Sequence, residues 1–217
     1  YELGRAYVKV GDETKARDVF NQILAIENST FAAQSLIELG MIERNRNNAD
    51  KAIAYYKRVV EQMPMSEYAD DALLAIESIY QSKNEPETYL AYIESIGKSS
   101  LKTEDEREQM IFNAAEQIFL SGDYAKALAS LQNYETKYPN GVLLSKAHFY
   151  TAESYKQLGN LESACDFYSK VITNGSGSFV EIAMLNFANI SYSLQEYDEA
   201  YTAYSNLYDK ALLDDNK

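Results

Sequence analysis

The amino-acid sequence predicts an all-α fold built from stacked pairs of helices. Its 217 residues include 19 Tyr and 8 Phe but only 9 Gly and 3 Pro, which favours long helices over a β fold with frequent turns. Segments that contain a turn, a small residue and then a large residue recur with a nearly constant period. The small and large residues are four positions apart, so they lie on one face of a helix.

Five such segments start at a turn and continue as a helix that we expect to be the second member of a pair. They are GDETKARDVFNQILAIEN from Gly11, NADKAIAYYKRVVEQMP from Asn48, GDYAKALASLQNYETKYPN from Gly122, GNLESACDFYSKVITNG from Gly159 and EYDEAYTAYSNLY from Glu196. Their small residues are Ala16, Ala52, Ala127, Ala164 and Ala200, with Thr88 in a weaker third copy. Successive spacings of 36, 36, 39, 37 and 36 residues indicate a solenoid of helix pairs.

Two further sets of residues predict how the helices pack. Large residues follow four positions after the small ones, at Phe20, Tyr56, Tyr92, Leu131, Tyr168 and Tyr204. The helix before each turn has its own small residue at Gly4, Gly40, Ala115, Ala152 and Ala188, with Ile76 as the exception. We expect each small pair to let two antiparallel helices approach closely, and the large residues to fill the space between one pair and the next.

Residues at the expected helix ends support this division. The predicted N-terminal signals are a capping box of Thr103 with Glu106, a second capping box of Ser178 with Glu181, and Ser66 as the N-cap before EYADDALLAIESIY. Pro64 and Pro139 are expected to close two second helices, because proline cannot continue a helix.

The third repeat departs from the pattern. Ile76, Thr88 and Ser95 replace smaller or apolar residues, Pro86 enters the first turn of the second helix, and the next spacing is stretched to 39. Gly97 is predicted to be a C-cap, with Ser99 and Ser100 in a loop. We therefore expect a bend or flexible seam near residues 97–103.

The expected domain organisation follows from these repeats. Residues 1–97 would hold repeats 1 to 3, of which the first is truncated and the third degenerate. Residues 98–217 would hold repeats 4 to 6 and a short C-terminal extension, in one continuous solenoid. The truncated first repeat suggests that the chain is a piece of a longer protein.

Charge and composition bound the possible partners. The formal net charge of -13 disfavours nucleic acid and anionic membrane surfaces, because binding to phosphate requires a basic patch. No apolar run approaches the roughly 20 residues needed to span a bilayer. A protein or peptide partner with apolar and basic character suits the chain best.

The sequence offers little for catalysis, and we expect no enzyme activity, cofactor or metal. His148 is the single histidine and lies in the predicted helix LSKAHFYTAESY, where a packed structural role is expected. Cys165 is predicted to be a small buried side chain. The acidic groups Asp70-Asp71 and Glu104-Asp105-Glu106 are expected at helix N-termini, where carboxylates complement the helix dipole.

The sequence resembles the tetratricopeptide-repeat family. The segment GDYAKALASLQNYETKYP contains the second half of the family pattern through Gly122, Tyr124, Ala127, Leu131 and Pro139, and the resemblance covers essentially the whole chain. It implies a right-handed α-solenoid of about six helix pairs that acts as a non-catalytic scaffold or adaptor. The stretch YPNGVLLSKAHFYTAESYKQLGN further resembles repeat proteins of the bacterial cell envelope, which implies a periplasmic or envelope-associated location and a role in envelope assembly. A cytoplasmic location is the alternative.

In this family the first helix of each pair lines the concave side, where partners bind. The resemblance therefore implies a partner-binding set of Ile37, Met41, Leu73, Glu77, Tyr80, Phe112, Glu116, Phe119, Phe149, Glu153 and Tyr192. Co-chaperone members of the family use Lys and Asn at such positions to bind a C-terminal carboxylate. Here these positions are apolar or acidic, which disfavours an acidic-tail clamp.

Two interpretations of this set remain open. It could form a groove with an aromatic floor and a ladder of Glu77, Glu116 and Glu153, or the aromatics could be core and the glutamates a solvated face. Two alternatives to the adaptor function also remain. The chain could be the regulatory repeat array of a signalling protein, or a glycan-binding envelope module with tyrosines clustered on one exposed rim.

Overall fold

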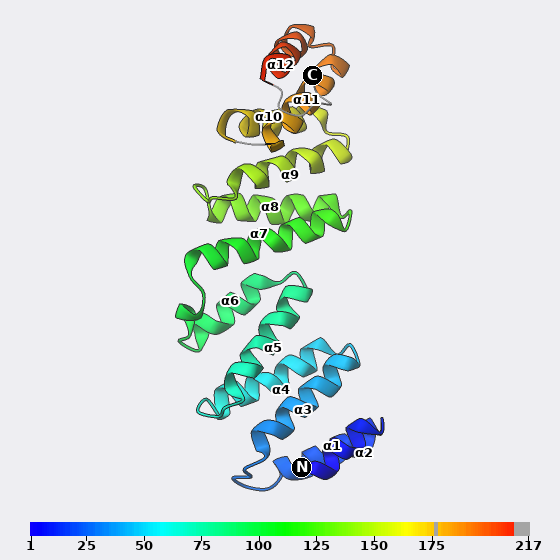
Figure 1. The fold of residues 1–217 in the computed structure, drawn as a ribbon, viewed down its shortest axis with the longest axis vertical. Helices are drawn as coiled ribbons and strands as arrows, with labels where there is room; N and C mark the ends of the chain where they lie inside the picture. Colours follow the sequence, from blue (N-terminus) through cyan, green and yellow to red (C-terminus); the bar gives the residue numbers. More distant parts are fainter. Residues whose placement is uncertain (176–177, 211–217) are drawn as a thin grey trace. The chain divides into compact units, whose positions relative to one another are not determined.

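The computed structural model describes residues 1–175 and 178–210, and within them the regular secondary structure is entirely helical (Figure 1). The helices are α1 (Glu2–Lys9), α2 (Glu13–Leu24), α3 (Ala32–Asn45), α4 (Ala49–Gln62), α5 (Ala69–Ser82), α6 (Pro86–Ser95), the 3-10 turn η1 (Ser99–Leu101), α7 (Glu104–Leu120), α8 (Tyr124–Lys137), α9 (Leu144–Gln157), α10 (Leu161–Asn174), α11 (Ser178–Ser193) and α12 (Tyr197–Lys210). The predicted all-α class is confirmed.

The helices divide into two compact units, each of three helix pairs. Unit 1 spans Tyr1–Ser99 and holds α1 to α6, whereas unit 2 spans Ser100–Lys217 and holds α7 to α12. Within each unit every helix packs against the next one along the chain. In unit 2 the first helices also contact one another, α7 with α9 and α9 with α11. The predicted C-terminal extension, residues 211–217, lies outside the described residues.

Small residues sit where the two helices of a pair meet, as predicted. Both sets of small residues are buried, including Gly4 and Gly40 on the first helices of unit 1, except for Thr88 of the third pair, which is exposed. A Cβ placed on Gly4 would lie 2.6 Å from the ring of Phe20, and one placed on Gly40 would overlap the ring of Tyr56. Glycine is needed at these two positions because the aromatic ring of the second helix occupies the space of a side chain.

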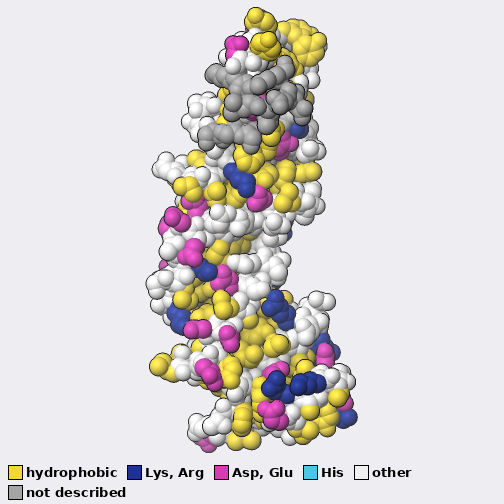
Figure 2. Space-filling model, viewed as in Figure 1, with side chains coloured by type: hydrophobic (Ala, Val, Ile, Leu, Met, Phe, Trp, Pro, Cys, Tyr) yellow, Lys and Arg dark blue, Asp and Glu magenta, His cyan; other side chains and the backbone are white. Residues whose placement is uncertain are grey.

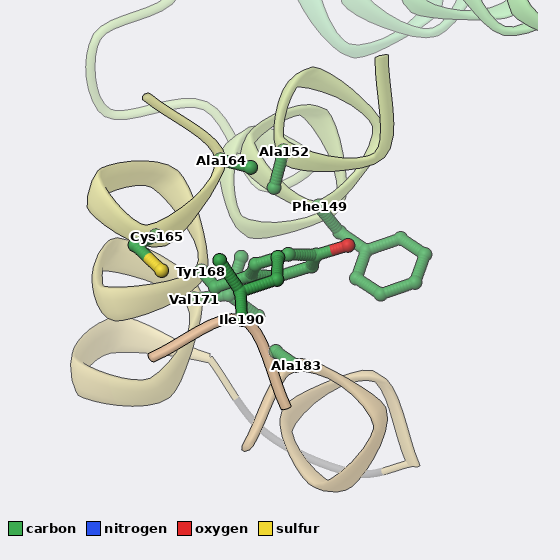
Figure 3. Close-up of a cluster of buried hydrophobic side chains, with 8 residues drawn as sticks. All are labelled: Phe149, Ala152, Ala164, Cys165, Tyr168, Val171, Ala183 and Ile190. Carbon is green, nitrogen blue, oxygen red and sulfur yellow. The ribbon is translucent and has the colours of Figure 1, made fainter. Parts of the chain in front are cut away.

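The large residues of the second helices form the core between pairs. Phe20, Tyr56, Tyr92, Leu131 and Tyr168 are all buried. Figure 3 shows the ring of Tyr168 extending from α10 beneath Ala152 and Ala164, with Ala183 and Ile190 of α11 on its other side. The last member of the series, Tyr204, is 37% exposed, because α12 is the last helix that the structure describes and no described helix covers it.

Several predicted helix ends are confirmed. Thr103 Oγ1 accepts a hydrogen bond from the Glu106 amide, and the Glu106 carboxylate accepts one from the Thr103 amide at 2.8 Å. Pro64 and Pro139 follow the ends of α4 and α8. Pro86 is the first residue of α6, a position at which a missing N–H costs nothing.

The predicted N-cap role of Ser66 is wrong. The α5 helix begins at Ala69 with Tyr68 as its N-cap, and Ser66 Oγ instead accepts a hydrogen bond from the Tyr68 amide at 3.2 Å. Ser66 therefore stabilises a turn two residues before the helix. The predicted capping box of Ser178 depends on a side chain outside the described part of the chain.

Gly97 ends α6 from the position after the C-cap residue, Ile96, and is not the C-cap itself as predicted. Its φ of +72° is accessible to glycine at little cost. The Lys98 amide donates to the Ile93 carbonyl at 2.7 Å and the Gly97 amide donates to the Glu94 carbonyl at 2.9 Å, a pairing that satisfies two free carbonyls of the last turn.

The close contact between Gly40 and Tyr56 leads to a stability prediction. Gly→Ala in a helix interior normally stabilises by up to ~1 kcal/mol. Gly40→Ala should instead lower the free energy of unfolding by about 1–3 kcal/mol, because the added methyl group overpacks the contact. Urea denaturation followed by circular dichroism measures this cost. In a Tyr56→Leu background the cost should shrink, and an unchanged cost would contradict the proposed overlap.

The seam at residues 97–103 stays a prediction, which hydrogen exchange can test. Amides of residues 98–102 should exchange faster than those of the central turns of α6 and α7, because short loops open locally without unfolding a whole unit. Uniform protection from α6 through α7 would argue against a flexible seam.

Candidate partner-binding surface

The eleven predicted binding residues lie on five first helices, α3 and α5 in unit 1 and α7, α9 and α11 in unit 2. In unit 2 these helices are neighbours. Phe112, Glu116, Phe119, Phe149, Glu153 and Tyr192 therefore belong to one continuous helical layer. Ile37, Met41, Leu73, Glu77 and Tyr80 lie on two helices of unit 1.

Burial separates the predicted residues into two groups. Leu73, Tyr80, Phe112 and Phe149 are buried, so they contribute to the core and not to a contact surface. Figure 3 shows the Phe149 ring beside Tyr168 within the α9–α11 core. By contrast, Met41 is 50% exposed and Tyr192 is 61% exposed. A partner could contact these exposed side chains directly, together with the half-buried Ile37 and Phe119.

Glu116 links two first helices. Its carboxylate accepts a hydrogen bond from Tyr150 Oη at 2.7 Å and lies 2.9 Å from Lys146 Nζ, both on α9. The ring of Tyr150 also packs against that of Phe119, with centroids 4.8 Å apart. The interaction therefore holds α7 against α9 through one carboxylate and one aromatic pair.

Glu153 has the same role one pair later. Its carboxylate accepts hydrogen bonds from Tyr168 Oη of α10 and from Asn186 Nδ2 of α11, the latter at 2.8 Å. Lys156 Nζ lies 3.0 Å from its second oxygen. Glu153 thereby joins three helices, α9, α10 and α11. In unit 1, Glu77 accepts a hydrogen bond from Gln81 within α5.

These contacts correct the interpretation of the glutamates as a solvated face. The side chains of Glu116 and Glu153 are only 18% and 15% exposed, and each is paired with a lysine. Their negative charge is therefore balanced locally. They act as acceptors between helices and do not form an open acidic ladder.

The electrostatics of the Glu116 pair follow from this environment. Burial alone would raise the pKa of Glu116, but hydrogen bonds from Lys146 and Tyr150 and the charge of Lys146 hold it below its ordinary value. Burial, with the hydrogen bond to Glu116, raises the pKa of Tyr150 to about 12. At neutral pH the pair therefore consists of an ionised carboxylate and a neutral phenol.

The prediction missed the partners of these glutamates, Lys146, Tyr150 and Asn186. A signal exists for Tyr150 and Asn186, which lie 34 and 33 residues after their glutamates, about one helical turn less than the repeat period. Hydrogen bonds at this spacing between successive first helices or their caps are Gln34–Tyr68, Arg44–Ser78, Glu116–Tyr150 and Glu153–Asn186. The first helices of successive pairs are staggered along their axes. A residue on one first helix therefore contacts a residue on the next that lies about one turn before its repeat equivalent.

The residues considered for chemistry are structural. Cys165 is buried, and burial raises the pKa of its thiol. His148 is buried with its ring against that of Phe167 at 5.7 Å and its Nε2 3.1 Å from Glu135 Oε1. Both structural interpretations are confirmed. The acidic groups at residues 70–71 and 104–106 lie in the first turns of α5 and α7, as predicted.

Residues 1–175 and 178–210 contain neither a cluster of metal-ligating side chains nor a helix suited to span a membrane. No group of three or more His, Cys, Asp or Glu side chains in this part of the chain could hold a metal ion. None of its helices has both the length and the apolar character of a membrane span. On the face shown in Figure 2, acidic and basic side chains are interspersed.

Tyrosines occur in two settings. Tyr56, Tyr89, Tyr92, Tyr134 and Tyr168 are buried along the junctions between helices. Exposed tyrosines gather on α12 at Tyr197, Tyr201, Tyr204 and Tyr208. This face of α12 corresponds to the face of α10 that α11 covers, so the exposure follows from the position of α12 as the last described helix.

Comparisons with known proteins match this repeat architecture. Residues 1–67 and 146–174 each match a family described as Tetratricopeptide repeat. A TPR repeat-containing protein of Methanocaldococcus jannaschii is 30% identical over 92 residues, or 41% of this chain. The match spans 28% of the length of that curated relative.

Solved structures with similar folds have low sequence identity. PilF of Pseudomonas aeruginosa is 20% identical, with 82% of this chain and 76% of that chain covered and a TM-score of 0.41. PilW, described as a widely conserved type IV pilus biogenesis factor, is 17% identical over 99% and 93% of the two chains, with a TM-score of 0.43. A tetratricopeptide repeat protein from Parabacteroides merdae is 14% identical over 99% and 80%, with a TM-score of 0.38.

The Glu153 contacts predict a structural cost of removing this carboxylate. Glu153→Ala should lower the free energy of unfolding by about 1–3 kcal/mol, because it leaves the buried Tyr168 hydroxyl without its acceptor. Chemical denaturation monitored by circular dichroism measures the loss. The exposed Glu162 of α10 provides the control, and Glu162→Ala should change stability by less than about 0.5 kcal/mol. Equal effects of the two substitutions would contradict this assignment.

The lowered pKa of Glu116 predicts a pH dependence of stability. A carboxylate whose pKa is lower in the folded state stabilises the fold above its unfolded pKa of about 4.3, and this contribution is lost on acidification. Thermal melting at pH 7 and pH 4 should therefore show a smaller acid-induced loss for Glu116→Gln than for the unaltered chain. Identical losses in the two proteins would show that Glu116 does not contribute.

Proposed function

Because the chain belongs to the tetratricopeptide-repeat family, we propose that it is a non-catalytic scaffold that binds a protein or peptide segment along its first helices. The observation that carries this proposal is the exposure of apolar side chains on those helices. Met41 on α3 and Tyr192 on α11 are half or more exposed, at positions that the family uses to contact partners. Exposed apolar side chains on regular helices can gain binding energy when a partner removes them from water.

The hydrogen-bond networks beneath this layer support the proposal in a different way. Glu116 and Glu153 are engaged with neighbouring helices, so they hold the layer in place. A surface that is already ordered loses less conformational entropy on binding, which favours affinity. These two glutamates are therefore positioning residues of the proposed surface.

The proposed partner segment combines apolar and basic side chains. The net charge of -13 favours association with a basic segment through long-range attraction. The local charge of Glu116 and Glu153 is already balanced by Lys146 and Lys156. The basic preference thus rests on the charge of the whole chain, and the exposed apolar side chains would supply most of the affinity.

For the cellular setting, we propose assembly of a bacterial cell envelope. The support is the resemblance of residues 138–160 to repeat proteins of that compartment. Fractionation of the source cells, with immunodetection of the protein, tests this setting. Recovery only in the cytosolic fraction would argue against it without affecting the scaffold proposal.

A peptide-display selection with the intact chain tests the binding surface. Selected peptides should be enriched in apolar and basic residues. Met41→Asp should lower the affinity of peptides that bind unit 1 at least about tenfold, and Tyr192→Asp that of peptides that bind unit 2, which corresponds to about 1.4 kcal/mol for each contact. Fluorescence anisotropy with a labelled peptide measures this loss.

Matched controls are available outside the first helices. Met65 lies in a loop and Tyr201 on α12, and both are strongly exposed. Met65→Asp and Tyr201→Asp should leave peptide affinity unchanged. If these variants weaken binding as much as the first-helix variants, the partner binds elsewhere and the assigned surface is wrong.

A further inference from the structure

A cavity of about 350 Å³ opens between α10 and α12 in unit 2, with α11 forming part of its wall. Half-buried apolar side chains line it, namely Ile172, Met184, Phe187 and Ala203. The exposed carboxylates of Asp198 and Glu199 stand at its edge. None of these residues belongs to the first-helix surface proposed above.

The preceding helix pair shows what fills the equivalent space. Between α8 and α10, the ring of Phe167 packs against His148 and Tyr155, each with centroids 5.7 Å away. Lys170 Nζ lies 4.0 Å above the Phe167 ring and 3.3 Å from Glu135. An aromatic ring with a cation over its face therefore fills this junction.

The repeat period identifies the corresponding residues one pair later. Positions 36 or 37 residues apart pair Phe167 with Ala203, Lys170 with Asn206, Glu135 with Ile172, His148 with Met184, Thr151 with Phe187 and Glu162 with Asp198. The replacements Ala203 and Asn206 on α12 therefore supply neither the aromatic ring of Phe167 nor the cation of Lys170. Phe187 and Ile172 make the wall more apolar, and Glu199 stands where the earlier pair has Ser163. The cavity thus lies at the position that the aromatic ring and the charged group of α10 fill in the preceding junction.

We propose that this cavity binds a partner segment that presents an aromatic side chain next to a lysine or arginine. The aromatic ring contacts the apolar wall and takes the place that Phe167 has in the preceding junction. The basic group pairs with Asp198 and Glu199 at the edge, which supplies charge complementarity. The volume lies within the range of small-ligand pockets and is large enough for one side chain and its neighbour.

This inference does not rest on the first-helix surface. It is based on a difference between two junctions of the same chain and assigns a second site on unit 2. Loss of binding at one site therefore leaves the other untouched, and the two proposals fail separately.

Titration of the intact 217-residue chain with N-acetyl-phenylalanyl-lysine amide tests the site. Two-dimensional NMR should show saturable shifts for Met184, Phe187, Ala203, Asp198 and Glu199, with a Kd on the order of 1 mM for so small a probe. N-acetyl-phenylalanyl-glutamate amide and N-acetyl-alanyl-lysine amide should bind at least about tenfold more weakly. Equal binding of the three probes, or shifts confined to other residues, would overturn the proposal.

Two variants separate the contributions of shape and charge. Ala203→Phe with Asn206→Lys copies the preceding junction, and it should fill the cavity, raise the melting temperature by about 2–4 °C and abolish binding of the probe. Asp198→Lys with Glu199→Lys alters only exposed side chains, so the variant should keep the fold. It should lower the affinity for the probe at least about tenfold. If the filling variant does not fold, this charge variant still decides the outcome.

Controls exclude the other occupants. Glu162→Lys, at the position equivalent to Asp198, should leave probe binding unchanged. Shifts of the cavity resonances that depend on protein concentration, without probe, would show that a second copy occupies the site. Shifts of the same resonances on Leu212→Ser with Leu213→Ser would show that residues 211–217 occupy it. Either result would overturn the assignment to a separate partner.

Discussion

In five of the six described helix pairs a small residue on the first helix faces an alanine on the second helix, and the other contacts in both units depend on this close approach. Where the first helix carries glycine, as at Gly40, the ring of the second helix occupies the space of the missing side chain. Where both residues are alanine, as at Ala152 and Ala164, the ring of Tyr168 lies beneath them and reaches the next pair (Figure 3). Because packed interiors tolerate little change in volume, one small-residue contact sets the spacing of helices within a pair and between pairs.

The tyrosines that fill these junctions also bring a requirement for polar partners. A buried phenol hydroxyl without an acceptor is costly, so each one constrains its neighbours. Tyr168 uses Glu153, and Tyr134 uses the buried Glu108 at 2.6 Å, which also accepts the Leu143 amide. The glutamates of the first helices are therefore explained by the tyrosines of other helices. This is why part of an apparent acidic ladder belongs to the internal framework.

The side chains that are available for binding lie at positions that the packing between helices does not determine. Met41 and Tyr192 are both exposed on first helices, although the Tyr192 ring also contacts that of Tyr197 on α12. Ala203 stands where Phe167 fills the equivalent space, so the same helix geometry encloses a filled junction in one place and a cavity in the next. Variation within a constant framework thus provides two kinds of surface, an exposed helical layer and a pocket, without any change of fold.

The sequence by itself determined the helix pairs, their order, several of their ends and most of the residues at their closest approach. These features depend on local periodicity and on residue size, which a single chain displays directly. The tertiary structure alone decided which first-helix residues are exposed, because Tyr80 occupies the same repeat position as Tyr192 yet is buried. It also decided the partners of Glu116 and Glu153, since the stagger between successive pairs places them one turn away from the repeat equivalents. Burial and hydrogen bonding depend on the positions of neighbouring helices, and the periodicity of one helix does not contain that information.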